Sequence, residues 1–347
     1  MLKIEDWSEI GDDFREGLIL GNGASIALHQ GFAYQSLLEQ ARKRQFIKQD
    51  VRNIFNHLRT KDFERVLRML WHTSKINRAL KIKDAKTEKA YKSLRTALVE
   101  TVKTIHPAHK MVRDGLPQIA KFMKRFNIVV SLNYDLLVYW TMLWENERHP
   151  NRFKDCFIHG EFDSDWQGYL KPYGRRSRST LVFYPHGNLA LAMDLNGRET
   201  KLTASAPSNL LETVTSKWGS GKYTPLFVSE GLSEQKVAAI NGSHYLKTVH
   251  DSVLPRLGKR VAIFGWSFSE SDKHILRAIC GYELEAVAVS VHPSTPNRED
   301  KCAEIKRRIK DASNGCSIKV VFFDANSQRC WLKMPDTTST MQKDILQ

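Results

Sequence analysis

The chain has 347 residues, of which 41% are hydrophobic and 26% charged, and its formal net charge is +15. This length allows one large domain or two smaller ones, and the composition is ordinary for a globular protein. No stretch approaches about 18 uncharged apolar residues and the N-terminus has no signal-peptide pattern, so we expect a cytoplasmic protein without membrane spans. The positive charge suits an anionic cofactor. A nucleic-acid partner has no further support in the sequence, since a solvated basic face explains most of these lysines and arginines.

The cysteines argue against a metal site. The chain has five of them: Cys156, Cys280, Cys302, Cys316 and Cys330. They are scattered and include no Cys-x-x-Cys pair, which argues against both a zinc ribbon and a disulfide framework. We therefore expect that the protein binds no zinc. We also expect its thiols to be free, as in a reducing compartment.

The first predicted strand ends in a glycine turn. Residues 1–17 indicate a lead-in helix or loop, and the apolar run at 18–20 is typical of a buried parallel strand. The turn that follows consists of Gly21, Asn22, Gly23, Ala24 and Ser25. Two glycines allow a tight turn and the close approach of a ligand, and a helix from about residue 25 would point its N–H groups at an anion. Ile26 replaces the third glycine of the dinucleotide fingerprint, so purely structural glycines are an equal alternative.

Residues 34–125 are predicted to form an α-helical insertion. Apolar residues recur at helical spacing in this segment, for example Phe63, Val66, Leu67 and Leu70. Their stripe indicates a helical core, and a lid or an oligomer surface is the alternative. Residues 73–85 have a weaker periodicity and are expected to form a loop or link.

A polar cluster follows the next predicted strand, at residues 128–130. The cluster contains Ser131, Asn133 and Asp135. Ligands of open α/β sheets bind beyond the carboxyl ends of the strands, which favours a functional role for these side chains. The alternative is that Asn133 and Asp135 only cap the helix that follows.

A histidine ends the predicted strand at residues 181–184. His186 lies between Pro185 and Gly187, and an unperturbed imidazole at this position could accept a proton near neutral pH. A second His-Gly pair occurs at His159, in a segment that looks less like a strand end. A lone histidine is more often structural than catalytic, so both readings stay open here.

Strands and helices continue to alternate toward the C-terminus. Strands are predicted at 226–231, 261–264, 286–291 and 318–323, helices at 233–240, 243–257, 273–280 and 302–309, a hairpin at 193–201 with Asn196-Gly197 at its turn, loops at 174–179 and 204–224, and a frayed tail after 336. This alternation predicts an α/β, Rossmann-like fold with a largely parallel sheet and helices on both faces. The polar residues that follow the strand ends would lie together at one edge of the sheet.

The order of these motifs resembles the sirtuin-like superfamily. The motifs are Gly21-x-Gly23-Ala24-Ser25, Asn133-Tyr134-Asp135, His186-Gly187, and Gly265-x-Ser267 followed by Asp272. The chain is most similar to bacterial sirtuin-like proteins that lack the zinc module, many of which degrade NAD in antiphage defence. The resemblance implies a discontinuous NAD-binding Rossmann domain at 1–33 and 126–347, interrupted by the insertion at 34–125.

The resemblance also assigns roles to individual residues. Gly21, Asn22, Gly23, Ala24 and Ser25 would line the pyrophosphate turn, Asn133 would orient the nicotinamide ribose or the attacking water, Asp135 would lie near the nicotinamide amide, His186 would be the general base, and Gly265, Ser267 and Asp272 would lie at the far ribose and phosphate. Asn133, His186 and Asp135 are therefore the catalytic candidates. The turn has Gly-Asn-Gly where sirtuins usually have Gly-Ala-Gly. The long spacing from Asn133 to His186 keeps His159 as the second choice of base.

The function that the resemblance implies is hydrolysis of NAD to ADP-ribose and nicotinamide. Cleavage of the nicotinamide–ribose bond passes through an oxocarbenium-like centre and needs a positioned nucleophile and a modest base. Without a zinc-supported peptide cleft, water is the natural acceptor. The alternatives are a protein deacylase or ADP-ribosyltransferase, and a non-enzymatic nucleotide-sensing subunit. Because unrestrained NAD hydrolysis would be toxic, we expect a homo-oligomer or a regulatory partner protein, with the insertion as the means of control.

Overall fold

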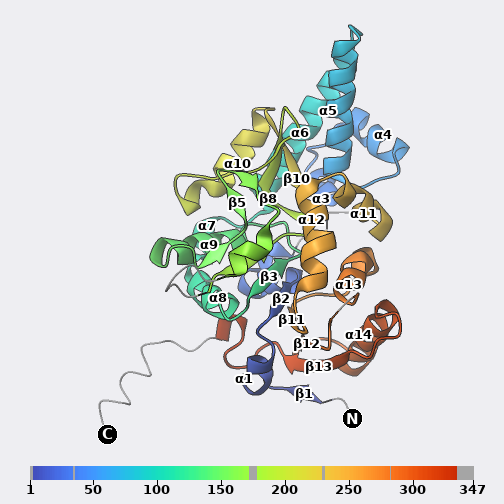
Figure 1. The fold of residues 1–347 in the computed structure, drawn as a ribbon. Helices are drawn as coiled ribbons and strands as arrows, with labels where there is room; N and C mark the ends of the chain where they lie inside the picture. Colours follow the sequence, from blue (N-terminus) through green and yellow to red (C-terminus); the bar gives the residue numbers. More distant parts are fainter. Residues whose placement is uncertain (1–2, 34–35, 172–177, 229–230, 282, 334–347) are drawn as a thin grey trace.

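The centre of the fold is an eight-stranded parallel sheet (Figure 1). The computed structural model describes residues 3–33, 36–171, 178–228, 231–281 and 283–333. Across the sheet the strands follow the order β1 (Ile4–Glu5), β13 (Lys319–Asp324), β12 (Ala286–Val291), β11 (Arg260–Phe264), β2 (Gly17–Leu20), β3 (Ile128–Ser131), β7 (Thr180–Phe183) and β4 (Phe153–Lys154). Each neighbouring pair is parallel. The predicted Rossmann-like α/β fold is confirmed.

The six inner strands have the Rossmann strand order. Numbered along the chain from β2, they run 3-2-1-4-5-6 from β7 to β13. The direction of winding reverses between β2 and β11, and ligands of such sheets bind in the crevice beyond the strand ends at this switch point. Leu20 of β2 lies level with Phe264 on one side and Ser131 on the other. The residues that follow these three strands therefore leave the sheet at the same height.

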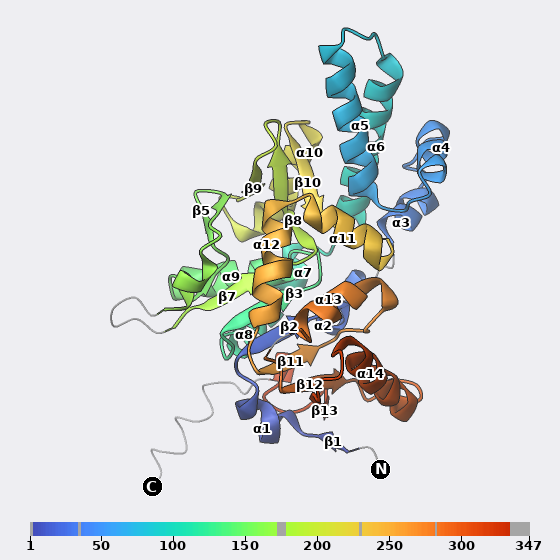
Figure 2. The same ribbon diagram turned by 45° about the vertical axis from the view of Figure 1, so that its right-hand side comes forward.

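Helices cover both faces of the sheet, as expected for central strands such as β2, β3 and β7, whose residues are all buried. Helices α8 and α9 pack together on one face, and α13 and α14 lie on the other (Figures 1 and 2). The helices are α1 (Trp7–Ile10), α2 (Asn22–Leu28), α3 (Leu37–Lys43), α4 (Gln49–His57), α5 (Phe63–Ala79), α6 (Ala85–Ile105), α7 (His109–Val112), α8 (Leu116–Met123), α9 (Leu137–Arg148), α10 (Leu210–Gly219), α11 (Ser233–Asn241), α12 (His244–Thr248), α13 (Lys273–Ile279) and α14 (Arg298–Ala312). Within the described ranges, none of them has the length and apolar content that a bilayer crossing would need.

Two small antiparallel sheets complete the molecule. Strand β8 (Gly187–Asp194) lies between β10 (Tyr223–Phe227) and β9 (Glu199–Lys201), and β5 (Phe157–Ile158) pairs with β6 (Glu161–Phe162). The hairpin from β8 to β9 turns at Asn196-Gly197, as predicted. The segment from α12 continues as helical turns through Val249–Val253 and Leu254–Arg256.

The expected link at 73–85 is wrong for most of its length. Helix α5 continues to Ala79, and α5 and α6 form a long pair that projects from the body of the molecule (Figure 2). Residues 73–79 contain no proline or glycine, and extending a formed helix costs little, so weak periodicity does not end it. Asp84 then caps α6 by accepting a hydrogen bond from the Thr87 N–H.

Three other expectations need correction. Residues 204–224 contain helix α10, because Leu210, Val214 and Trp218 form a fully buried stripe at intervals of four residues. The lead-in contains β1, a two-residue strand that depends on its pairing with β13. Helix α2 begins at Asn22 rather than near residue 25, since extended Gly21 is its N-cap. The expected loop at 174–179 lies mostly outside the described residues, as does the tail after 336.

The division into a Rossmann domain and an insertion at 34–125 stays a prediction. Helices α3 to α6 lie on the side of the molecule away from β1 and β13 (Figures 1 and 2). Helix α8 falls inside the expected insertion but packs against α9 beside the sheet.

The glycine at the end of β2 provides a stability test. A Cβ at Gly21 would lie 2.4 Å from the Trp266 Cα, which is backbone and cannot rotate away. We expect Gly21→Ala to lower the free energy of unfolding by about 1–3 kcal/mol, measured by urea denaturation. Gly219→Ala is the matched control, because nothing lies within 4 Å of that Cβ. Equal stability of the two variants would contradict the close packing described here.

Candidate functional site

The glycine turn after β2 is packed against the loop after β11. The Gly21 N–H donates to the Phe264 carbonyl at 2.9 Å, and the Gly23 N–H donates to the Gly265 carbonyl at 2.8 Å. Gly265 has φ +69°, and a Cβ there would lie 2.3 Å from the Ala24 nitrogen. The glycines at 21, 23 and 265 are therefore required by the approach of two backbones at the switch point.

This packing limits which groups of the turn could meet a phosphate. The N–H groups of Gly21, Gly23 and Ala24 all donate to backbone carbonyls of the protein. The Asn22 N–H has no acceptor among the described residues and is the donor of the turn left for an anion. Its side-chain amide reaches the Phe32 carbonyl at 3.5 Å.

Asn133 is held by a buried polar network that joins β2 to β3. Its Nδ2 donates to the Gly21 carbonyl at 3.1 Å and to Ser25 Oγ at 3.0 Å. Ser25 Oγ in turn donates to Asp135 Oδ2 at 2.6 Å, and Asp135 Oδ1 accepts from the Leu137 N–H at 2.9 Å. Within the described ranges, Asn133 Oδ1 accepts no hydrogen bond, so this oxygen is the one available to a ligand.

Asp135 combines the two roles that its sequence position allowed. It caps the start of α9 through Leu137, and it also orients Ser25 toward Asn133. Burial raises the pKa of Asp135 to about 6, although hydrogen bonds from Ser25 and Leu137 oppose the shift. Its carboxyl is therefore close to its titration point near neutral pH.

His186 lies in a tight turn between β7 and β8. The Gly187 N–H closes the turn on the Tyr184 carbonyl at 2.9 Å, and the His186 carbonyl accepts from the Val228 N–H at 2.7 Å. Gly187 has φ +71°, and a Cβ there would lie 2.2 Å from the Leu226 carbonyl oxygen. A hydrogen bond with the backbone of Leu132, the residue before Asn133, acts to raise the pKa of His186, and the Leu189 N–H donates to the carbonyl of Tyr134, the residue after Asn133, at 2.8 Å. The two catalytic candidates are thus brought together.

A cluster of buried polar side chains surrounds His186. Its Nε2 lies 3.0 Å from His274 Nε2 and 3.9 Å from Asp272 Oδ1. Asp272 also pairs with Lys236, whose Nζ lies 2.8 Å from the same oxygen. The sequence placed Asp272 beside Ser267 at the far ribose, whereas the structure places it beside the candidate base.

Burial governs the protonation of this cluster. Burial, together with the charge of Lys236, lowers the pKa of His186 to about 4. Burial and the neighbouring His186 lower the pKa of His274 to about 3. Burial raises the pKa of Asp272, but His186 and Lys236 outweigh it, and the net shift is downward. Both imidazoles are therefore neutral at pH 7, next to an ion pair of Lys236 and Asp272.

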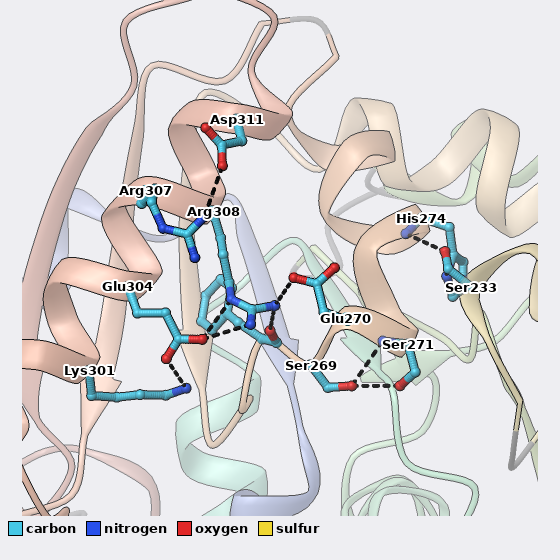
Figure 3. Close-up of polar contacts among 11 residues, drawn as sticks. Ser233, Ser269, Glu270, Ser271, His274, Lys301, Glu304, Arg307, Arg308 and Asp311 are labelled. Atoms are coloured by element: carbon cyan, nitrogen blue, oxygen red, sulfur yellow. Dashed lines mark hydrogen bonds and ion pairs between the residues drawn. The ribbon is translucent and has the colours of Figure 1, made fainter.

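The loop after β11 is fixed from its outer side by α14. Arg308 donates to the Phe268 carbonyl at 2.8 Å and pairs with Glu270 and Glu304 (Figure 3). Phe268 has φ +56°, and its ring stacks on Trp266 at 4.4 Å. Ser267 lies between these two residues in the sequence, is exposed, and makes no hydrogen bond to the described residues. It is free to meet a ligand.

His159 lies apart from this cluster. It occupies the turn between β5 and β6 together with Gly160, and both have positive φ, at 52° and 87°. Two consecutive positive φ angles are what a two-residue hairpin turn requires, and histidine is among the residues that tolerate this conformation. Its side chain is exposed. The conformation of this hairpin turn therefore explains why His159 and Gly160 occur together.

Sequence reasoning missed His274, Ser233 and Lys236. His274 had a usable signal, because it follows Asp272 by two residues at the start of a helix that leaves a strand end. Lys236 and Ser233 had none, since α11 reaches the cluster only through tertiary packing. Within the described ranges, no group of three or more histidine, cysteine, aspartate or glutamate side chains is arranged to hold a metal ion.

Two surface hollows lie elsewhere on the molecule. One, of about 870 Å³, is lined by residues that include Arg148, Lys154 and Lys171. The other, of about 370 Å³, lies between α4 and α5 and is lined mostly by apolar atoms. Neither contains Asn133 or His186.

The buried titratable groups predict a pH dependence of stability. His106, like His186, has a pKa that burial lowers to about 4. Unfolded histidines bind protons below about pH 6.5 while these remain neutral in the fold, so stability is lost as the pH falls from 6.5 toward 4. Asp135 acts in the opposite direction, because its raised pKa makes the folded state the better proton acceptor between about pH 4 and 6.

Replacing Asp135 with asparagine should therefore steepen the acid loss of stability. We expect Asp135→Asn to lose about 2 kcal/mol more than the wild type between pH 6.5 and 4.5, measured by urea denaturation at each pH. Asp194→Asn, at an exposed hairpin, is the control and should leave the slope almost unchanged. Parallel pH profiles for wild type and Asp135→Asn would contradict the raised pKa.

In the comparison with known families, one family model covers the whole site. Residues 18–331 match the family described as a domain of unknown function, DUF4917. No curated protein matches the chain. The matched range begins in β2 and includes the glycine turn, Asn133, His186 and His274. The chain therefore belongs to the DUF4917 family.

Proposed function

We propose that this protein hydrolyses NAD to ADP-ribose and nicotinamide, as a regulated effector of antiphage defence. The observation that carries the proposal is the meeting of Asn133 and His186 beside the switch point of a Rossmann sheet. Each comes from the end of a different strand, and the segments that carry them are joined by the hydrogen bond from the Leu189 N–H to the Tyr134 carbonyl. A crevice at this position is where sheets of this order bind nucleotides.

The polar network suits the chemistry of glycosidic cleavage. Asn133 has its amide nitrogen fixed by two acceptors, which leaves Oδ1 aimed for a ribose hydroxyl or the attacking water. His186 is neutral and can accept a proton. The nicotinamide ring nitrogen of NAD already carries a positive charge, so nicotinamide leaves as a neutral molecule. The site therefore needs no strong acid to protonate the leaving group. Water would be the acceptor.

Other residues that follow the strand ends would hold the dinucleotide. The Asn22 N–H is the free donor of the first turn and would meet the pyrophosphate. Ser267 is exposed beyond β11 and would meet the adenosine side. Asp135 lies behind Asn133 and would act on the substrate through Ser25 and Asn133.

A second candidate function is nucleotide sensing without catalysis. It is favoured by the contact between the Nε2 atoms of His186 and His274, which leaves His186 engaged within the protein. A sensor would bind NAD and leave it intact.

Incubation with NAD, followed by chromatography for nicotinamide and ADP-ribose, separates the two functions. We expect turnover by the wild type and a loss of at least about a hundredfold in Asn133→Ala and His186→Ala, the usual scale for a positioned catalytic group. His159→Ala is the matched control and should remain active. Loss of activity in His159→Ala with an active His186→Ala would overturn the choice of base. Binding of NAD without cleavage would favour the sensor.

The end of the α5–α6 pair is the proposed contact between copies of the chain. Ile76, Leu80 and Ile82 are 57%, 65% and 52% exposed there, although each is apolar. We expect the triple replacement of these residues by serine to shift an oligomer toward the mass of one chain, measured by light scattering after size-exclusion chromatography. Serine replacement of Met111 and Ile158, exposed elsewhere, is the control. An unchanged mass would remove this surface from the assembly.

A further inference from the structure

Two buried histidines from different parts of the chain face each other through the same ring atom. His186 follows β7 and His274 lies in α13, and their Nε2 atoms are 3.0 Å apart. His274 Nδ1 lies 3.2 Å from Ser233 Oγ on α11 (Figure 3). Both imidazoles are less than a tenth exposed. Each neutral ring carries a single N–H, so the direction of each hydrogen bond can be worked out.

The Leu132 carbonyl fixes the direction of the chain of hydrogen bonds. His186 Nε2 faces His274, so we assign the hydrogen bond between His186 and the Leu132 backbone to Nδ1; because a carbonyl can only accept, Nδ1 then carries the proton. His186 Nε2 is then an acceptor, and His274 must donate to it from its own Nε2. His274 Nδ1 is left as an acceptor for the Ser233 hydroxyl. That hydroxyl is free to donate, because its oxygen already accepts from the His274 N–H.

This arrangement has a consequence for catalysis. The Nε2 lone pair of His186 is the only one in its ring that can accept a proton, and it lies in the ring plane toward His274. A substrate hydroxyl needs the same lone pair, so it cannot bind there while His274 donates to it. The hydrogen bond also stabilises neutral His186 and makes it a weaker base.

We propose that His274 is a positioning residue that masks His186, with Ser233 setting the tautomer of His274. The inference rests on the proposed function for its effect on turnover, but the hydrogen bonds themselves do not. If Ser233 moves away, the proton of His274 can sit on Nδ1 instead, and Nε2 then has no proton to donate. Two Nε2 lone pairs that face each other repel, so His274 moves aside and leaves His186 Nε2 open to a substrate, with no net gain or loss of protons.

The surroundings allow such control from a distance. Ser233 is the first residue of α11 and His274 lies in the first turn of α13, so a displacement between these two helices separates Ser233 from His274. The other groups that face the pair are Lys236 from α11, Asp272 before α13, and His250, whose ring stacks on His274 at 6.0 Å. Lys236 and Asp272 neutralise each other, so His274 has no unpaired charge beside it to favour its protonation.

Nitrogen-15 NMR of the histidine rings in the full chain tests the hydrogen bonds without any substrate. We expect the Nδ1–H tautomer for His186 and the Nε2–H tautomer for His274, with His186→Gln used to assign the signals. In His274→Leu, the His186 pKa should rise by about one unit, because it loses a hydrogen bond to its neutral form. A wild-type His186 protonated on Nε2 would overturn the inference.

Turnover of NAD provides the second measurement. His274→Leu and Ser233→Ala should raise kcat about tenfold, the ratio for one net hydrogen bond. His274→Gln, whose amide can donate to the same nitrogen, should stay near the wild type. Ser243→Ala, which removes the corresponding cap of α12, is the matched control and should not raise kcat.

The outcomes separate the inference from the proposed function. Activity that falls in His274→Leu, or that rises equally in His274→Gln, would overturn the masking role. The expected tautomers and pKa change in a protein that never cleaves NAD would support the histidine contact and overturn the hydrolase.

Discussion

The backbone contact between the ends of β2 and β11 is the constraint on which the site depends. Gly21 and Gly265 bring two chain segments so close that no side chain fits between them. The same contact presents the Gly21 carbonyl to Asn133, because Asn133 Nδ2 donates to it. A wider separation at the switch point would remove that acceptor. The position of Asn133 therefore depends on backbone packing that itself takes no part in the proposed reaction.

The second part of the site depends on excluding water from charged and titratable groups. His186 and His274 are shielded from water, and both stay neutral for that reason. Lys236 and Asp272 remain charged because they pair with each other. Such a cluster is sensitive to any change in packing, since each member relies on a partner from another helix or turn. This is the kind of arrangement in which a small displacement of α11 or α13 changes the chemistry of a group that does not itself move.

Sequence reasoning recovered the parts of the fold that have a local signal. The buried strands read as apolar runs, and the Asn196-Gly197 turn identified its hairpin. It failed where tertiary contacts decide the outcome. Strand β1 has only two residues and exists because β13 offers it an edge. Helix α10 was obscured by its serine- and threonine-rich neighbours, although its buried stripe of Leu210, Val214 and Trp218 is regular.

The sequence by itself determined the Rossmann-like fold, the glycine turn and the polar residues at the strand ends, because periodicity and turn chemistry are local properties. It also brought forward Asn133 and His186 as candidates. Only the tertiary structure decided that Asp272 lies beside His186, that His159 belongs to a hairpin turn, and that His274 and Ser233 join the site. The contacts of Asp272, His274 and Ser233 cross between segments about 40 to 90 residues apart, and no local pattern encodes which side chains will meet when α11 and α13 pack against the turn after β7.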